Sequence, residues 1–477
     1  MKQVQKSPYI QKMRPAAKAL LDALSPLYDH VSILVTDAEA KNYRLSRGGV
    51  GVSQSTTFGD KGCVVKVYDG SSYAEYATSD LTKENVPAIV AKIQKELMPM
   101  GHALPKGVQL STYPALPDEA QVFFGATEYE IHPREMGDDE ILSHLRKARE
   151  KAMAHDERVI DAMAYASYQE YHKLFLSKNK DLEQSVLWMT CGLGAFASKG
   201  ESMKDYRKGY SNLGGAEVLF QMEADAEEVA KVTVELLDSE EMTPGVYDCI
   251  CTPEVTGMIV HEAFGHGVEM DMFVKDRALA QQYIGKYVAS PLVTMHDGAA
   301  AAKETATYFF DDEGVFAKDT IVIEKGILKA GISDAQSAMH LYTEPTGNGR
   351  RETYERKAYT RMTNTYFEGG ESTLEEMIQS ISYGMLLENA TSGMEDPKNW
   401  GIQCMVNMAR EIKDGKLTGR IFSPVVLTGY VPDLLKSISM MSQTVELGGG
   451  GACGKGYKEW VKVSDGGPYI KAKIRLG

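Results

Sequence analysis

The chain has 477 residues, about three times the length of a common ~150-residue domain, so we expect two or three domains. Hydrophobic residues make up 43% and charged residues 25%, usage typical of globular proteins, which excludes collagen-like, low-complexity and wholly disordered chains. Lys and Arg number 52 against 66 Asp and Glu, a formal net charge of −14. This charge repels phosphate backbones and anionic lipids, so nucleic acid and membranes are not expected partners.

The cysteines and the N-terminus bear on the cellular compartment. Six cysteines in a chain of this length are too few and too scattered for a disulfide framework. The basic N-terminal stretch has no unbroken apolar run, because Lys12, Arg14 and Pro15 interrupt it, so we expect no export signal. No apolar run approaches the ~20 residues that span a bilayer. We therefore expect a soluble protein of the reducing cytoplasm.

Residues 1–117 are predicted to form an N-terminal α/β domain. The β-branched runs at 31–37 and 62–68 are bounded by Gly and Asp and are typical of strands. The stretch 83–97 has apolar residues at helical spacing and predicts a helix. A segment at 98–117 that contains Pro and Gly is expected to end this domain.

Residues 118–244 are predicted to form a central α/β segment and residues 245–477 a β-rich C-terminal domain, which makes the chain an α+β protein. The central segment has helical periodicity at 139–155 and 225–237 and strand-like sequence at 159–177 and 187–198. Near the C-terminus, apolar residues at 470, 472, 474 and 476 alternate with polar neighbours, which is the period of a strand.

The stretch 252–271 carries a candidate site. Thr252 can cap a helix and Pro253 suits its first position, so a helix is predicted to run into His261 and His266. The zinc-protease motif H-E-x-x-H places its histidines at i and i+4, whereas these stand at i and i+5, about 140° apart on a regular helix. Both can bind one metal if a π-bulge or an unwound end distorts the helix, and the glycines at 265 and 267 would permit that.

Glu262 lies beside His261 and would then act as the general base on metal-bound water. A catalytic zinc needs a third protein ligand, and the sequence offers four candidates: Glu269, Asp271, His296 and Cys453. Spacing alone leaves a second interpretation open, in which a plain helix end carries two partly buried histidines and no metal.

Cys453 stands in the glycine-rich stretch 447–456. Glycine lets backbones approach closely, and a thiolate beside a cation is stabilised as a ligand. The same stretch matches the phosphate loop G-x-x-x-x-G-K as far as Lys455, but Gly456 replaces the required Ser or Thr and no helix is predicted to follow. We therefore do not expect a nucleotide site.

Five motifs occur in a fixed order along the second half of the chain: HEAFGHGVEMD at 261–271, DDEGVFAKDTIVIEKGILKA at 311–330, GNGRRETY at 347–354, RMTNTY at 361–366 and GGACGKG at 450–456. Together they resemble the TldD/PmbA metallopeptidase family, also labelled modulators of DNA gyrase. Their order and spacing are similar to those of the TldD-type subunit. The resemblance is strong from about residue 245 to the end and looser before it.

This resemblance implies one zinc ion per chain, bound by His261, His266 and Cys453, with Glu262 as the catalytic carboxylate. It also implies a dimer around an enclosed cavity, either a homodimer or a heterodimer with a paralogue that lacks the metal residues. The activity implied is proteolysis of unfolded or leader-type peptides that are held as an extra β-strand, a mode with little sequence preference.

The glycine–arginine loop with Asn348, Arg350 and Arg351 has two interpretations. Either it forms a turn whose arginines pair with nearby carboxylates, or it lines the peptide cleft with the arginines facing a substrate carboxylate or an oxyanion. The second interpretation predicts substrate binding by these three residues and by Gly450 and Gly451.

Two functions follow from the sequence. The first is a zinc-dependent peptidase, which the complete set of His261, Glu262, His266 and Cys453 favours. The alternative is a non-catalytic regulatory subunit of the same fold that binds a peptide or partner, which has no need of a general base beside metal ligands.

Overall fold

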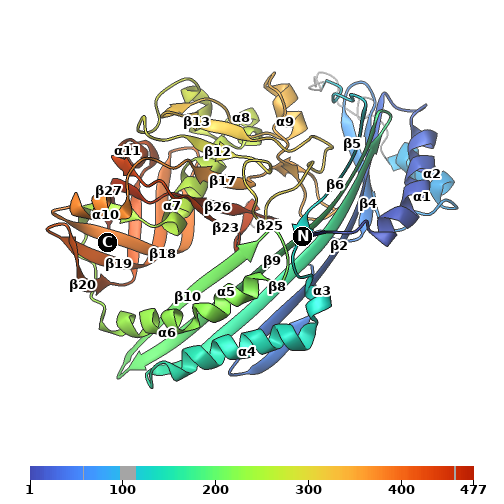
Figure 1. The fold of residues 1–477 in the computed structure, drawn as a ribbon. Coiled ribbons are helices and arrows are strands. Elements are labelled where there is room, and N and C mark those ends of the chain that lie inside the picture. The colour runs from blue at the N-terminus through green and yellow to red at the C-terminus, as the bar shows by residue number, and fades with distance from the viewer. Residues whose placement is uncertain (57–58, 97–113, 456–457) are drawn as a thin grey trace.

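A computed structural model describes residues 1–56, 59–96, 114–455 and 458–477. Figure 1 shows a long twisted sheet from the first half of the chain beside a β-rich part from the second half. Helices accompany both parts, and the predicted α+β class is confirmed.

The first half of the chain forms one eight-stranded sheet. Its strands follow the order β10-β9-β8-β2-β4-β5, with β3 beside β2 and β6 beside β9. The strands are β2 His30–Ser46, β3 Gly49–Ser53, β4 Gly62–Tyr68, β5 Tyr73–Thr78, β6 Gln121–Ala126, β8 Val159–Ser177, β9 Lys180–Lys199 and β10 Ser202–Asn212. The four strands predicted for this half are therefore confirmed, and β2 and β9 extend well beyond the predicted stretches. A separate pair joins β1 Lys2–Gln3 to β7 Glu128–Tyr129.

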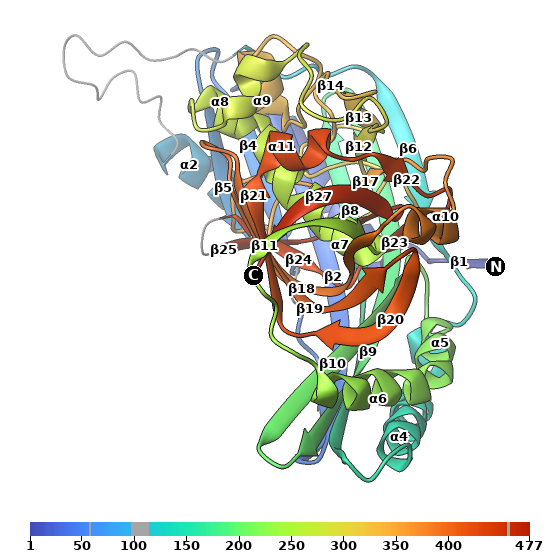
Figure 2. The ribbon, with the colours of Figure 1, turned by 90° about the vertical axis from the view of Figure 1, so that its left-hand side faces the viewer.

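Two groups of helices cover different ends of the long strands (Figures 1 and 2). Helices α1 (Pro8–Leu24) and α2 (Val86–Glu96) share a core with β2 and β4. Helices α4 (Asp138–Ala154), α5 (Val218–Ala224) and α6 (Ala226–Glu235) share another core with β8 and β9. The helices predicted at 83–97, 139–155 and 225–237 are thus present, although Leu97 lies outside the described residues and the last helix ends in a 3₁₀ turn, η2 (Leu236–Asp238).

Strand pairing crosses the predicted division at residue 117. Strand β2, from residues 1–117, pairs with β8, from residues 118–244, from Ser32 opposite Ser177 to Leu45 opposite Ala164. The N-terminal domain and the central segment of the prediction therefore contribute strands to one sheet, because hydrophobic period identifies a strand but not its partner.

Five strands of the second half close into a ring. Strand β11 pairs with β18, then β19, β21 and β27 follow, and β27 pairs back with β11. These strands are β11 Gly245–Cys251, β18 Tyr383–Asp396, β19 Gly401–Lys413, β21 Val425–Tyr430 and β27 Ile470–Leu476. Strands β20 (Lys416–Phe422) and β22 (Met440–Met441) pair with β19 and β27 outside the ring. The alternation predicted at 470–476 is confirmed, since residues 470, 472, 474 and 476 are buried.

A six-stranded sheet lies beside this barrel, and helix α7 (Pro253–Val260) packs between the two. The sheet has the order β14-β13-β12-β17-β26-β23. Its strands are β12 Met295–Asp297, β13 Thr320–Glu324, β14 Ile327–Leu328, β17 Asn364–Phe367, β23 Glu446–Gly448 and β26 Ser464–Gly467. The apolar side chains of this helix are buried, namely Val255, Ile259 and Val260. Contacts on both sides therefore fix the position of the histidines at the end of α7.

The remaining elements are short and connect these layers. They are α3 Pro133–Met136, η3 His261–Gly265, η4 His266–Val268, α8 Met270–Val274, η5 Leu279–Tyr283, α9 Ala335–His340, β15 Gly349–Arg350, β16 Tyr359–Thr360, α10 Leu374–Gln379, α11 Val431–Lys436, β24 Ala452–Lys455 and β25 Lys458–Lys462.

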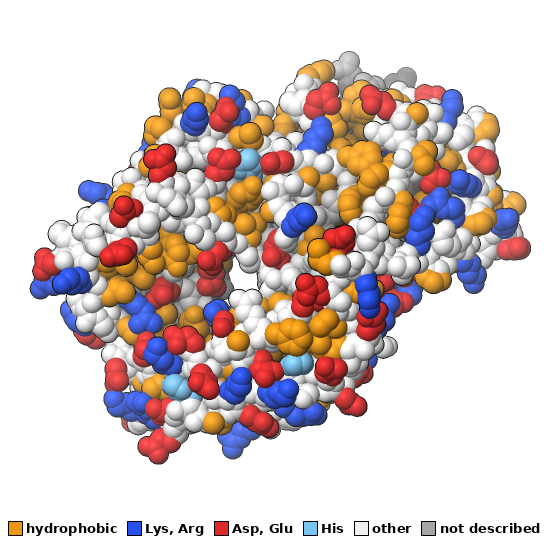
Figure 3. Space-filling view, in the orientation of Figure 1, with side chains coloured by type: hydrophobic (Ala, Val, Ile, Leu, Met, Phe, Trp, Pro, Cys, Tyr) orange, Lys and Arg blue, Asp and Glu red, His pale blue; other side chains and the backbone are white. Residues whose placement is uncertain are grey.

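Three features can be compared with the composition: the hydropathy of the helices, the state of the cysteines and the charge on the surface. In the part of the chain that the structure describes, no helix combines the length and apolar character needed to cross a bilayer. All six cysteines are buried free thiols. On the face drawn in Figure 3, Lys and Arg side chains are interspersed with Asp and Glu, so basic charge is not concentrated there.

Candidate metal centre and cleft

The helix changes its winding at the first histidine. Helix α7 ends at Val260 and continues as the π-helical turn η3, in which the N–H of His266 donates to the carbonyl of His261. This i to i+5 bond brings the two imidazoles together, with ring centroids 5.2 Å apart. The predicted π-bulge is therefore confirmed. Gly265 permits a close approach here, because a Cβ at this residue would collide with Met362 Sδ.

The start of the helix differs from the prediction. Thr252 has the extended backbone of a capping residue, but its side chain makes no capping hydrogen bond. Its hydroxyl is buried without a hydrogen-bond partner among the described residues. Thr252 therefore occupies the predicted N-cap position without a side-chain cap, and Pro253 occupies the first helical position as predicted.

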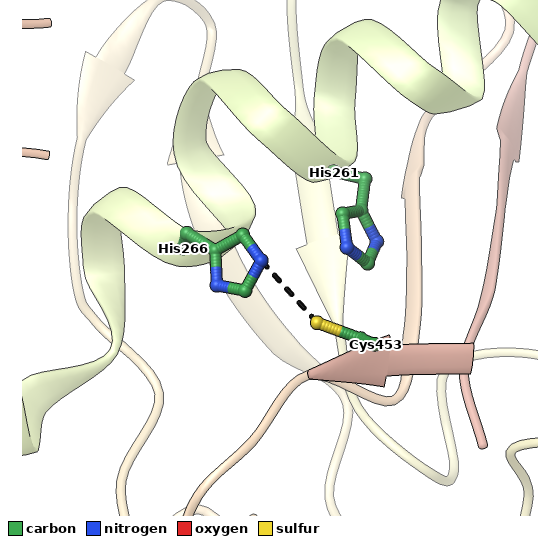
Figure 4. Close-up of side chains that lie close together, drawn as sticks. All are labelled: His261, His266 and Cys453. Atoms are coloured by element: carbon green, nitrogen blue, oxygen red, sulfur yellow. Dashed lines mark hydrogen bonds between the residues drawn. The ribbon is translucent and has the colours of Figure 1, made fainter. Parts of the chain in front are cut away.

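A short hairpin brings a thiol to the two imidazoles. Cys453 lies on β24, which pairs with β25, and its Sγ is 3.2 Å from His266 Nε2. One donor atom from each of His261, His266 and Cys453 lies within 4.8 Å of the others. Figure 4 shows the histidines reaching down from the helix and the cysteine rising from the strand. His261 and Cys453 are only 7% and 5% exposed, so the three donors meet in a largely desolvated place.

The three groups influence one another electrostatically. Burial acts to raise the pKa of the Cys453 thiol, but hydrogen bonding to His261 and His266 outweighs burial and lowers that pKa to about 5. Burial lowers the pKa of each imidazole, but the Cys453 thiolate, joined at His266 by the Glu269 carboxylate, more than compensates and raises both pKa values above the usual value. The Nδ1 atom of His261 is buried without a hydrogen-bond partner among the described residues. One thiolate and two imidazoles match the ligand chemistry of zinc.

A buried carboxylate connects the helix to the hairpin. Glu269 Oε2 lies 3.3 Å from His266 Nδ1 and 3.1 Å from Lys455 Nζ, and Arg361 Nε lies 3.5 Å from Glu269 Oε1. Arg361 also donates to the carbonyl of Cys453 at 2.9 Å. Burial alone would raise the pKa of Glu269, but Lys455 and His266 hold it well below its usual range. An ionised Glu269 orients the His266 ring so that Nε2 faces Cys453.

Glu262 and the three donors line one cleft of about 800 Å³. Its walls are the histidine turn, the hairpin from Gly451 to Lys455 and the end of β18. Strand β18 confines the Glu262 side chain, since a Cβ on Gly393 would lie only 2.9 Å from Glu262 Cδ. Glu262 is 9% exposed, and its position in the cleft suits a group that exchanges protons with a bound molecule.

Three other candidate ligands have different surroundings. Glu269 and Asp271 contact Lys455 and not the thiol, with Asp271 Oδ1 at 2.6 Å from Lys455 Nζ. His296, on β12, lies between Asp319 and Glu368 at 2.7 and 2.8 Å and stacks on Tyr366. Of the four candidates, Cys453 is the one within the histidine cluster.

The glycine–arginine loop does not line this cleft. The Asn348 amide is fully buried and donates to Asp297 Oδ1 at 2.7 Å and to the carbonyl of Arg361 at 3.0 Å. Arg351 makes a two-pronged ion pair with Glu75 of the first sheet at 2.6 and 2.9 Å. Arg350 and Arg351 line a separate cavity of about 60 Å³ between the two halves of the chain.

The structure therefore favours the turn interpretation for Asn348, Arg350 and Arg351, because each of the three donates hydrogen bonds to neighbouring protein groups. None of the three is among the residues that line the cleft of the histidines, and their role in substrate binding stays a prediction. Gly451 does line the cleft of the histidines, and Gly450 is an exposed neighbour with no atom near its absent Cβ.

Sequence reasoning missed two acidic residues of the cleft. Asp465, on β26, places Oδ2 3.6 Å from His261 Nδ1, slightly beyond hydrogen-bond distance. Glu395, on β18, lies in the same wall as Gly393. Neither residue stands in a motif that points to a metal or a substrate, so the sequence carries no local signal for them. Arg361 did stand in one of the five motifs, but its role was not apparent from the sequence.

Comparisons with known proteins agree with this arrangement. A family model described as the PmbA/TldA metallopeptidase C-terminal domain matches residues 244–475. A metalloprotease of Methanocaldococcus jannaschii is 25% identical over 463 residues, which cover 94% of this chain and 97% of the relative. A zinc metalloprotease TldD homolog of Saccharolobus solfataricus is 29% identical over 235 residues, which cover 49% of this chain and 52% of the relative.

The fold has solved counterparts over nearly the whole chain. The crystal structure of a Thermotoga maritima protein labelled a modulator of DNA gyrase superposes with a TM-score of 0.77 at 17% identity. That match covers 97% of this chain and all of the other. Family model, named relatives and fold point the same way, and this chain belongs to the TldD/PmbA metallopeptidase family.

Proposed function

We propose that this chain is a zinc-dependent peptidase that hydrolyses unfolded or leader-type peptides bound in an extended conformation. The observation that carries the proposal is the convergence of His261, His266 and Cys453 in a cleft that Glu262 also lines. Catalytic zinc sites use three protein ligands and keep one position for the reaction. The names of the relatives, a metalloprotease and a zinc metalloprotease, support the same activity.

In the proposed reaction, His261, His266 and Cys453 would hold the zinc ion, which would supply the Lewis acidity that polarises a carbonyl and lowers the pKa of water. Glu262 accepts a proton from the attacking water and delivers it to the amine nitrogen as the C–N bond breaks. The contact with β18 at Gly393 restricts the carboxylate to one wall of the cleft. Glu269 keeps the His266 ring in its ligating orientation.

Two strand edges at the cleft support binding of an extended peptide. Within the described ranges, β18 pairs only with β19 from Glu388 onward, and β24 pairs only with β25. Both strands border the cleft. The main-chain N–H and C=O groups on the second edge of β24 and of this part of β18 face no other strand of the described ranges. A peptide added there as a strand gains main-chain hydrogen bonds, while its side chains contribute little selectivity.

We also propose that the peptidase acts in the cytoplasm as a dimer, with itself or with a paralogue that lacks the metal residues. A reducing compartment suits six free buried thiols. Enclosure of the cleft by a partner would protect folded proteins from a peptidase with weak sequence preference. The alternative function, a non-catalytic regulatory subunit, would give Glu262 no use beside the three donors.

A matched pair of variants tests the activity. Glu262→Gln preserves the shape of the side chain but cannot accept a proton, so zinc should stay near one ion per chain while turnover falls on the order of a hundredfold or more. Glu324→Gln is the control, because Glu324 is the exposed last residue of β13 and its side chain pairs with Lys329 at the surface. The assay follows a mixture of short unstructured peptides by mass spectrometry, together with zinc content by elemental analysis.

Two outcomes would contradict the proposal. Near wild-type turnover by a zinc-loaded Glu262→Gln variant would assign the proton transfer to another carboxylate. A zinc-loaded wild type that binds peptides and cleaves none of a diverse library would favour the regulatory subunit.

A further inference from the structure

A second cavity lies between the two halves of the chain, and none of the described residues lines both this cavity and the cleft of the histidines. Residues of strands β2, β8 and β9 line one side, and residues of the stretches 305–312 and 350–354 and of strand β25 line the other. The cavity has a volume of about 60 Å³. One water needs about 10–15 Å³ of such space, so roughly four or five water-sized groups fit, which is the number of heavy atoms in acetate or phosphate.

Lys462, on β25, is a buried lysine of this cavity whose amino group has no polar partner. The residue is only 6% exposed. Within the described ranges its Nζ makes no hydrogen bond and no ion pair, and it lies over the Trp188 ring of β9, 4.8 Å from the ring centroid. The Glu304 and Asp465 carboxylates act to raise the pKa of Lys462, but neither forms an ion pair with it, and burial outweighs both and lowers that pKa to about 7. An anion in the cavity would restore the charged form.

The other charges that line the cavity leave a surplus of positive groups. Two of its four cations form ion pairs with carboxylates, namely Lys173 and Arg351. Arg350 forms no ion pair in the described part of the chain, and its guanidinium donates to the main-chain carbonyl of Met362 at 2.6 Å. Among the acidic lining residues, Asp37 has a lysine partner at 3.2 Å, and Glu352 accepts from a main-chain N–H at 3.2 Å. Arg350 and Lys462 are thus two cations without a carboxylate partner, against Glu352 as one carboxylate without a cation.

We propose that this cavity binds one small oxyanion, either a carboxylate or a phosphate, with Lys462 and Arg350 as its charged partners. A charge-assisted hydrogen bond from each cation would offset the cost of burying its charge. A neutral ligand of the same size would leave the Lys462 amino group unpaired, and a peptide is too large for a cavity of this volume. The site is distinct from the cleft of the histidines, so it does not depend on the peptidase function.

The position of Lys462 connects the anion to the hairpin that carries the thiol. Lys462 is paired with Ala452, the residue before Cys453, across strands β25 and β24. Trp188, under the Lys462 amino group, belongs to β9 of the first sheet. An anion held by Lys462 and Arg350 therefore adds contacts where the two halves of the chain meet. Because a ligand that binds only the folded chain raises its stability, the melting temperature should rise with the anion concentration.

The test titrates acetate and, separately, inorganic phosphate into the zinc-loaded full-length chain at pH 7 and constant ionic strength, followed by calorimetry and thermal unfolding. Wild type should bind one anion per chain. Lys462→Met and Arg350→Gln should each bind at least roughly tenfold more weakly, because each loses a hydrogen bond from a charged group. Lys473→Met replaces an exposed lysine of β27 and is the matched control, which should bind as tightly as wild type. Zinc content and melting temperature without added anion verify that the variants are folded and loaded.

The two probes separate the two kinds of oxyanion. Tighter binding of acetate, lost in both variants, would assign the site to carboxylates, and tighter binding of phosphate with the same loss would assign it to phosphates. Binding of equal strength by wild type and Lys462→Met would place the anion elsewhere, for example at the zinc ion, and would overturn the proposal. Weaker binding in only one of the two variants would refute a site built on both cations. The proposal also fails if neither probe shows saturable binding to wild type.

Discussion

The close contact between β18 and Glu262 gives a sharp test of the site. In Gly393→Ala, the new Cβ would lie 2.6 Å from Met258 Sδ and 2.9 Å from Glu262 Cδ. Ordinary contacts between such atoms are about 3.5–4.0 Å, so the strand or the Glu262 side chain must move by roughly 1 Å. The backbone itself is not the obstacle, since Gly393 has no positive φ.

The size of the effect follows from that displacement. Overpacking a buried contact costs about 1–3 kcal/mol of folding stability. A misplacement of about 1 Å at a reacting group can lower the rate on the order of a hundredfold. We therefore expect Gly393→Ala to reduce kcat/KM by tenfold to a hundredfold and to lower the melting temperature modestly, while zinc content stays near wild type because no metal donor is touched.

Gly401→Ala is the control, because Gly401 lies on the neighbouring strand β19 with no atom within 4 Å of its absent Cβ. The assay measures hydrolysis of a short unstructured peptide, zinc per chain and thermal unfolding for both variants and wild type. Wild-type kinetics for Gly393→Ala would refute the argument that the contact with β18 positions Glu262 for catalysis.

Three further predictions follow. Cys453→Ala should lose most of its zinc because two imidazoles alone bind the ion weakly. Unchanged zinc by elemental analysis would make Glu269 or Asp271 the third ligand instead. Burial lowers the pKa of Lys462 to about 7, so the unfolded chain binds more protons between pH 7 and 10.5 and stability should rise with pH across that window. Lys462→Met should remove this rise and increase the free energy of unfolding at pH 7 by on the order of 3–5 kcal/mol. The control Lys473→Met changes an exposed lysine and should do neither. Matching denaturation curves for the two variants would contradict the effect of burial assigned to Lys462. A short unstructured peptide should be cleaved while the same sequence inside a stably folded protein is spared, and equal cleavage of both by mass spectrometry would rule out an enclosed cleft.

The sequence by itself determined several of the elements and pointed to the histidine turn. Helical and strand periods located α4, α6, β8 and β27 because these signals reside in neighbouring residues. The spacing of His261 and His266 required a distorted helix if both were to bind one metal, and a π-helical turn forms there. The five motifs added the family, which local periodicity alone does not reveal.

Only the tertiary structure decided which distant groups meet. Spacing left four candidates for a third ligand, and the fold brings Cys453, 187 residues from His266, to 3.2 Å from its imidazole. The fold likewise turns Glu395 into the cleft and moves Asn348 into a buried hydrogen-bond network. Contacts of this kind depend on strand order, register and the packing of α7 between two sheets. A strand's period states which face is buried but not which strand lies beside it, so these contacts could not be predicted from one sequence.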